Sequence, residues 1–426
     1  MMKKRYAQVG VGGRARFFYQ AIVGTYSETS ELVGFCDLNQ TRMDFANALL
    51  KKEYGAAPIP TYPVERFDDM IREQKPDVVI VTTIDRAHHK YIIRAMELGC
   101  DVITEKPLTT TAEKCQEIID VQKRTGRNIR VSFNYRYAPF HSKCREVIAS
   151  GAIGDIHSVH FEWLLDIHHG ADYFRRWQRD KRNSGGLQVH KSTHHFDLVN
   201  FWIASQPKTV FAWGDLKFYG RENAENRGIT KFYNRSTHNP NAEGDPFAID
   251  LTQNETLRGL YYDAEKEDGY LRDQSVFGDG ISIEDTLGVM VKYKNGTIMT
   301  YSLNAYTPYE GYRIAFNGSK GRLELTSLDV PYINGGGVVD GAAEEQTMKV
   351  FPMFGDAYEV EFTEGEGGHG GGDPVLLNDL FGVPGEDPLH RAASHIDGAM
   401  SILTGIAANK SMATGMPVEV ETLVHF

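Results

Sequence analysis

Two histidines and an aspartate are spaced so that a single helix would bring them together. His190, His194 and Asp197 follow the glycine pair Gly185-Gly186 at spacings of four and three residues, which places side chains on one helix face, a turn apart. A neutral imidazole can take a proton at pH 7, so we expect His194 to be an acid/base group, with His190 as a substrate contact or relay. The pair could instead bind a metal or be purely structural. The further ligands of a metal would be His168, His169 or Asp172.

A glycine-rich turn follows the first predicted strand. Val9-Gly10-Val11-Gly12-Gly13-Arg14-Ala15 fits the pattern G-x-G-x-x-A, which opens a helix in dinucleotide-binding folds. The first glycine permits the tight turn, the second lets a pyrophosphate approach the backbone, and the helix N-terminus supplies amide donors. The residues expected to bind a dinucleotide here are Gly10, Gly12, Gly13, Arg14 and Ala15.

An aspartate at the end of the second predicted strand bears on the choice of dinucleotide. Asp37 closes the sequence Gly34-Phe35-Cys36-Asp37. A carboxylate there can bind both hydroxyls of a ribose and repels a 2′-phosphate, so we expect NAD in preference to NADP. Arg42 is near enough in sequence to keep NADP open.

Further motifs accompany the glycine turn along most of the chain. Glu105-Lys106-Pro107 follows one predicted strand, and Thr82-Thr83-Ile84-Asp85-Arg86-Ala87-His88 follows another. The remaining motifs are Asn134-Tyr135-Arg136-Tyr137, Gly151-Ala152-Ile153-Gly154, Gly185-Gly186, Gly318-Ser319-Lys320-Gly321 and His369-Gly370-Gly371-Gly372-Asp373. Together they resemble the Gfo/Idh/MocA oxidoreductase family, which includes glucose–fructose oxidoreductase and inositol dehydrogenase.

The resemblance implies an NAD(P)-dependent dehydrogenase acting on a CH-OH group. Its members transfer a hydride to or from a secondary hydroxyl of a sugar, sugar derivative or cyclitol, and generally need no metal, so we expect none. It also implies that Lys106 lies beside the nicotinamide, where burial would lower its pKa. Whether Pro107 is cis stays open. The other cofactor-binding residues that it implies are Thr83, His88, Glu105 and Asn134. The implied substrate-binding residues are Tyr135, Arg136, His168, His169 and Asp197.

The chain departs from the family at the second catalytic motif, D-x-x-x-H-x-x-D. When His194 and Asp197 take the final H-x-x-D, His190 stands where the first aspartate would be. This puts ordinary dehydrogenation in doubt but keeps the lysine–histidine pair.

An alternative function in the same fold is a glycoside hydrolase or lyase with tightly bound NAD. Such an enzyme oxidises its sugar transiently, eliminates the substituent and reduces the product. An imidazole at position 190 could take the proton that the oxidation acidifies. A non-catalytic sugar or nucleotide sensor is a further alternative, against which Lys106 and His194 argue.

The elements that must position these residues fall into two halves. Residues 1–138 alternate short apolar strands with amphipathic helices, which predicts a Rossmann domain with a doubly wound parallel sheet. Residues 139–426 read as an α+β domain with a large open, mainly antiparallel sheet, a polar insertion at about 219–284 and a C-terminal helix at about 389–408. Lys294-Asn295-Gly296 predicts a hairpin turn with two positive φ angles. The predicted strands are 6–9, 31–36, 77–82, 101–104 and 129–133, then 156–165, 209–218, 286–293, 297–303, 312–316 and 321–325.

Composition narrows the classes of partner. The 426 residues carry a formal net charge of −11, which disfavours nucleic acid and anionic membranes as partners. No apolar run is long enough to span a membrane. Only four cysteines occur, which fits a reducing compartment and a cytoplasmic protein. The family's open sheet often forms its oligomer interface, so the resemblance implies a homodimer or homotetramer with a small-molecule carbohydrate or cyclitol as substrate.

Overall fold

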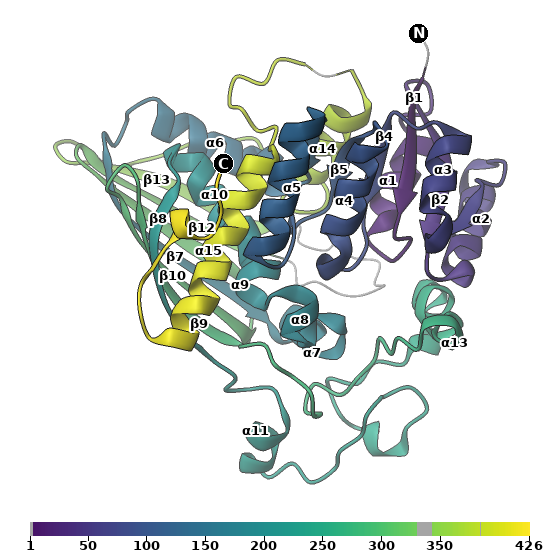
Figure 1. Ribbon diagram of the computed structural model, residues 1–426. Helices are drawn as coiled ribbons and strands as arrows, with labels where there is room; N and C mark the ends of the chain where they lie inside the picture. Colours follow the sequence, from purple (N-terminus) through teal and green to yellow (C-terminus); the bar gives the residue numbers. More distant parts are fainter. Residues whose placement is uncertain (1–2, 330–342, 384) are drawn as a thin grey trace.

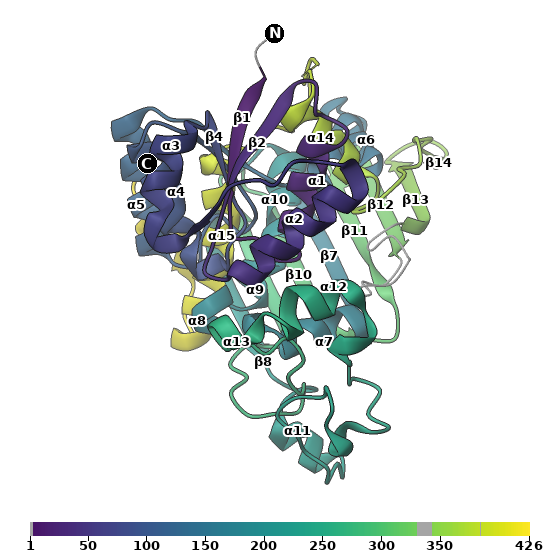
Figure 2. The same ribbon diagram turned by 90° about the vertical axis from the view of Figure 1, so that its right-hand side faces the viewer.

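The computed structural model describes residues 3–329, 343–383 and 385–426. The chain begins with a six-stranded parallel sheet in the order β3-β2-β1-β4-β5-β6, with helices on both faces (Figures 1 and 2). The strand order reverses between β1 and β4, and ligands of such sheets bind beyond the carboxyl ends of the strands at this switch point. The strands are β1 (Lys4–Val9), β2 (Ser30–Asp37), β3 (Thr61–Pro63), β4 (Val78–Val81), β5 (Asp101–Thr104) and β6 (Ile129–Val131). The helices are α1 (Ala15–Val23), α2 (Gln40–Tyr54), α3 (Phe67–Gln74), α4 (His88–Glu97) and α5 (Ala112–Thr125).

All five predicted strands of the first half are confirmed, and one strand was missed. β3 has three residues, the last of them Pro63, and pairs only with the end of β2. An edge strand this short has no alternation to detect.

The second part of the chain is built on a nine-stranded sheet in the order β14-β13-β12-β11-β7-β10-β9-β8-β15. β7 and β10 pair in parallel, and the other neighbours are antiparallel. The predicted fold class is therefore confirmed in both halves. The strands are β7 (Ile156–Asp166), β8 (Pro207–Asp215), β9 (Thr286–Tyr293), β10 (Ile298–Thr307), β11 (Glu310–Gly318), β12 (Gly321–Asp329), β13 (Ala343–Pro352), β14 (Tyr358–Glu359) and β15 (Val418–Glu419).

Two local expectations were wrong. The C-terminal helix, α15 (His395–Thr414), begins and ends six residues later than predicted, because Ser394 and Asp397 form a capping box that fixes its start. The hairpin between β9 and β10 is present, but of its two turn residues only Gly296 has a positive φ. The turn therefore needs one left-handed residue and not two.

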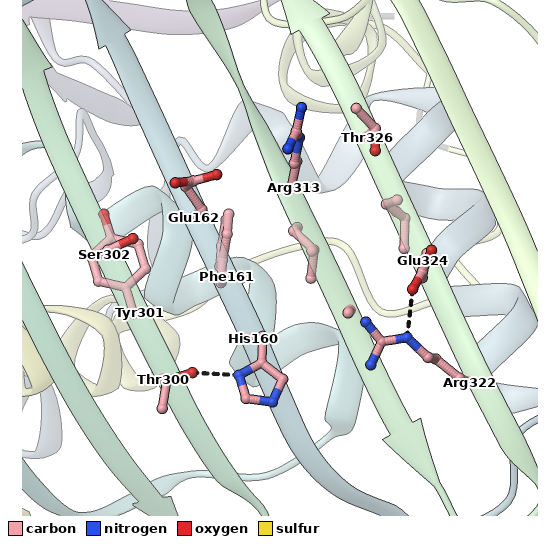
Figure 3. A pocket seen from close by; sticks show the side chains of 13 residues that line it. His160, Phe161, Glu162, Thr300, Tyr301, Ser302, Arg313, Arg322, Glu324 and Thr326 are labelled. Atoms are coloured by element: carbon pink, nitrogen blue, oxygen red, sulfur yellow. Dashed lines mark hydrogen bonds and ion pairs between the residues drawn. The ribbon is translucent and has the colours of Figure 1, made fainter. Parts of the chain in front are cut away.

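Helices cover one face of the second sheet and leave the other open. α15 packs on β8 and α10 (Ser192–Ile203), between the two sheets (Figure 1), and the strands alternate buried and exposed residues. On the other face, polar side chains of β7, β10, β11 and β12 line a hollow, among them His160, Glu162, Arg313 and Glu324 (Figure 3). The predicted homodimer or homotetramer stays a prediction. Within the described residues, no helix has the length and apolarity that crossing a membrane requires.

The polar insertion contains helical turns and contacts the first domain. It contains α11 (Arg221–Asn226), α12 (Glu255–Leu257), a π-helical turn (Arg258–Tyr262) and α13 (Glu265–Asp268). α12 and α13 lie beside α2, on the side of the first domain that is opposite the N-terminus (Figure 2).

Candidate active site

The glycine turn has the geometry that a bound phosphate needs. A Cβ on Gly10 would lie 2.6 Å from the backbone nitrogen of Thr83, and its φ is +85°, so only glycine fits there. A Cβ on Gly12 would meet nothing within 4 Å, which leaves open space beside the backbone. The amide of Gly13 donates to the hydroxyl of Tyr261, 3.2 Å away, from the insertion.

Asp37 lies at the end of β2 and links the glycine turn to the start of α2 by hydrogen bonds. One carboxylate oxygen accepts from the amide of Val11 at 2.5 Å and the other from the amide of Asn39 at 2.9 Å. Burial raises the pKa of Asp37, and these amides and Arg42 oppose the rise. Nearby, the Arg42 guanidinium is 2.6 Å from Asp268 of the insertion and 3.8 Å from Asp37.

The Glu105-Lys106-Pro107 turn follows β5 and brings a lysine to the switch point. The Lys106–Pro107 peptide bond is cis. Glu105 accepts from the Arg14 side chain at 2.8 Å and from the Lys106 amide at 3.2 Å. The Lys106 ammonium donates to the carbonyl of His190 at 3.3 Å. Burial lowers the pKa of Lys106, while Glu105 and Asp85 oppose that change.

His88 supports this turn from α4. Its two ring nitrogens lie 2.8 Å from the carbonyl of Pro107 and 3.0 Å from that of Thr83. Both nitrogens thus contact backbone carbonyls, and His88 holds the turn that carries Lys106. Its contact with the cofactor stays a prediction.

His190 meets a carboxylate that the sequence analysis did not select. Its Nδ1 is 2.5 Å from Oδ2 of Asp85, which lies in the 3-10 turn Asp85–Ala87 after β4. Burial lowers the pKa of His190, as do Lys106 and Arg176. Burial also raises the pKa of Asp85, against the pull of Lys106. Because two cations face this pair, we assign an ionised Asp85 that accepts from Nδ1–H of a neutral His190.

His190 and His194 lie in two helical segments and not in one continuous helix, contrary to the prediction. The helix is broken at Lys191, so His190 ends α9 (Leu187–His190) and His194 lies in α10. The ring of His194 packs against Tyr135, and its buried Nδ1 has no hydrogen-bond partner within the part of the chain that the structure describes. Burial lowers its pKa well below the usual value.

Arg136 and Asp197 are paired with each other in the interior of the protein. Nε and one terminal nitrogen of Arg136 donate to the two oxygens of Asp197 at 2.7 and 2.6 Å. Both side chains are at least 97% buried, and Arg136 also contacts Asp397 at 3.0 Å. The two groups thus hold each other in the interior as a bidentate pair, and their binding of a substrate stays a prediction.

The remaining expected substrate residues are Tyr135, His168 and His169. Tyr135 packs edge-on against His194 and against His369 of the glycine loop, at 4.9 and 5.2 Å between ring centres. His169 at the start of α7 (Ile167–Arg175) bonds Glu310 at 2.8 Å and the Tyr173 hydroxyl at 2.9 Å. His168, the next residue back, is exposed.

Lys191 is a second lysine at this centre that the sequence analysis passed over. It is 4% exposed, and burial lowers its pKa to about 8. Its ammonium lies over the rings of Trp163 and Tyr135, at 5.1 and 5.8 Å, and forms no hydrogen bond or ion pair with any described residue. The break between α9 and α10 positions it, and a helix pattern gives no signal for such a break.

The residues present fit a dinucleotide at the switch point. Gly12 leaves space for phosphate, Asp37 closes the second strand, and the side-chain oxygen of Asn134 is buried without a partner among the described residues. Its amide nitrogen is held by Asp373 at 2.7 Å. No three His, Cys, Asp or Glu side chains of the described segments form a metal-binding group.

Comparison with known proteins decides the family. A family model described as the oxidoreductase family, NAD-binding Rossmann fold, matches residues 4–133, and its partner, the C-terminal alpha/beta domain, matches residues 145–420. The chain belongs to the Gfo/Idh/MocA oxidoreductase family. It is therefore an oxidoreductase with an NAD-binding Rossmann domain, as the motifs predicted.

Several members of the Gfo/Idh/MocA family resemble the chain to different degrees. The oxidoreductase YteT of Bacillus subtilis is 37% identical over 97% of both chains. D-glucoside 3-dehydrogenase of Escherichia coli is 33% identical over 36% of this chain and 41% of its own length. The WlbA dehydrogenase of Chromobacterium violaceum, solved with NADH and UDP-GlcNAcA, shares the fold with a TM-score of 0.63 at 17% identity, over 98% of this chain and 96% of its own.

The buried Arg136–Asp197 pair yields a stability prediction. Arg136→Met should lower the free energy of unfolding by about 3–5 kcal/mol, because it leaves the buried Asp197 carboxyl without its partner. Arg136→Met combined with Asp197→Leu should cost less than the single change. Arg182→Met, at a pair whose arginine is 88% exposed, is the control and should cost about 0–1 kcal/mol. Urea denaturation measures all three, and equal losses at both sites would contradict the assignment.

Proposed function

We propose that this protein is an NAD-dependent dehydrogenase acting on a secondary hydroxyl of a sugar, sugar derivative or cyclitol. The contact between Lys106 and the His190 carbonyl carries the proposal. It joins the Glu105-Lys106-Pro107 turn of the Rossmann domain to a histidine that is hydrogen-bonded to Asp85. Two of the relatives above, the glucoside dehydrogenase and WlbA, are named for such chemistry or bound to a sugar nucleotide. When bound, the nicotinamide accepts or returns a hydride.

The chain's own residues handle the proton and the substrate. Neutral His190, oriented by Asp85, takes the hydroxyl proton at Nε2 as the hydride leaves carbon. Lys106, with its lowered pKa, donates a hydrogen bond to the same oxygen. Tyr135, which packs against His194 and lies under the Lys191 ammonium, offers an apolar surface for sugar C–H groups.

A redox-neutral hydrolase or lyase is the second candidate. The Asp85–His190 pair favours it, since a buried imidazole backed by a carboxylate can remove a carbon-bound proton once the neighbouring hydroxyl is oxidised. Such an enzyme would release an aglycone with no net NADH.

A panel of sugars, sugar acids, glycosides and cyclitols tests the function. We expect NAD-dependent absorbance at 340 nm with at least one class. Lys106→Ala should lower that turnover by roughly 10²-fold or more while NADH still binds, because acid–base assistance is lost. Lys114→Ala, a partly buried lysine on α5, is the control. Release of aglycone without NADH would favour the second candidate, and unchanged turnover in Lys106→Ala would refute the role of Lys106.

The Asp85–His190 pair predicts a shift in the pH profile. Asp85→Asn removes a negative charge from beside His190 and Lys106, which lowers the pKa of both groups. The acid limb of kcat/KM should therefore move to lower pH, and kcat should fall, with little change in KM. Asp85→Glu should recover part of the wild-type profile. A fall in kcat without any movement of the acid limb would show that Asp85 acts only on structure.

The setting of Arg42 predicts a preference for NAD. Asp268 at 2.6 Å and the Leu260 carbonyl at 3.1 Å engage two of the three nitrogens of its guanidinium, so most of this group is already bound and less able to hold a 2′-phosphate. NADH should bind more tightly than NADPH in calorimetric titration. Asp37→Ser and Asp268→Asn should each narrow the difference in affinity between NADH and NADPH. The first removes the repulsion between the Asp37 carboxylate and a 2′-phosphate, and the second frees Arg42 to bind that phosphate. Tighter binding of NADPH by the wild type would overturn this preference.

A further inference from the structure

The insertion reaches from the second domain onto the dinucleotide site of the first. Its residues 251–273, which we call the clasp, have a small apolar cluster of their own. Leu251, Leu257, Leu260 and Tyr261 form it, and Phe45 of α2 packs against it. A Cβ on Gly259 would lie 2.3 Å from the Phe45 ring, so the two surfaces are in close contact.

Polar contacts fix the clasp to the loop and helix that follow Asp37. The Glu267 carboxylate accepts from the amides of Gln40 and Thr41, at 2.6 and 3.1 Å, at the N-terminus of α2. The Asn39 side chain donates to the Ala264 carbonyl at 2.8 Å. Together with the pair of Arg42 and Asp268, these contacts hold the clasp over the end of β2.

A separate contact brings the clasp to the glycine turn. The Tyr261 hydroxyl accepts from the Gly13 amide, one of the donors that open the helix after this turn. A phenol that accepts from an amide still has its own proton to donate, and an anionic oxygen at the turn is a suitable acceptor. The clasp thus touches both places that a dinucleotide's adenosine and phosphates would occupy.

The C-terminal end of the clasp is bonded to the second domain. Arg272 is 1% exposed and pairs at 2.8 Å with Asp172 of α7, itself 2% exposed. Arg235 pairs with Asp273 next to it. The clasp is held by α2 on one side and by Asp172 of α7 on the other. Moving it away from α2 therefore requires several of these contacts to break together.

We propose that the clasp closes over the adenosine and pyrophosphate part of the bound dinucleotide and slows its release. The proposal rests on the proposed NAD-dependent function and adds where the cofactor is held and how long it stays. Glu267, Tyr261 and Asp268 supply the contacts.

The rate at which NADH leaves the protein tests the clasp. Bound NADH is chased with excess NAD and followed by its fluorescence, without any substrate. Glu267→Gln and Tyr261→Ala should each raise the dissociation rate about tenfold or more, since each removes a hydrogen bond that holds the clasp in place. Glu243→Gln, at an exposed position of the insertion outside the clasp, is the matched control and should leave the rate unchanged.

A second measurement uses only the wild-type protein. Arg258 and Lys266 are exposed trypsin sites within the clasp, and NADH should slow cleavage at both. The proposed role of the clasp is wrong if the clasp variants and the control release NADH at the same rate. It is also wrong if bound NADH does not slow trypsin cleavage of the clasp. If the wild type binds no NADH or NADPH in titration, the proposed function fails and the clasp with it.

Discussion

A lysine that is only partly exposed can stand where the two sheets meet because two carboxylates lie near it. Removing an ammonium from water is costly unless opposite charge is near, and Glu105 and Asp85 supply it at Lys106. Each carboxylate has a second partner: Glu105 pairs with Arg14 of the glycine turn, and Asp85 with His190 of α9. One charge requirement thus couples the cofactor turn, the lysine turn and the second domain.

The fold brings these groups together by aligning strand ends. The loops after β1, β4 and β5 leave the same edge of a parallel sheet, which places the glycine turn, Asp85 and Lys106 side by side. The second domain adds its own strand ends at β7 and β11, where Asp166 and Glu310 hold the start of α7. The helices between the two sheets then carry His190 and His194 to the junction.

The insertion shows how a polar segment can take on an ordered structure. Its own apolar cluster is small, and it depends on Phe45 of the first domain and on backbone amides at the start of α2. A carboxylate at a helix N-terminus satisfies donors that would otherwise lack partners. The segment therefore links the two domains on the side where the dinucleotide motif lies.

The sequence by itself determined the two-domain plan, the glycine turn, Asp37 and the lysine turn, because these depend on local periodicity and on contiguous motifs. Only the tertiary structure decided the partners. Asp85 and His190 are 105 residues apart, and Arg136 and Asp197 are 61 apart, so no local pattern links them. The break at Lys191 separated two histidines whose spacing predicted one face. Burial and charge pairing across domains, which spacing does not encode, settled which polar residues are saturated and which still face the site.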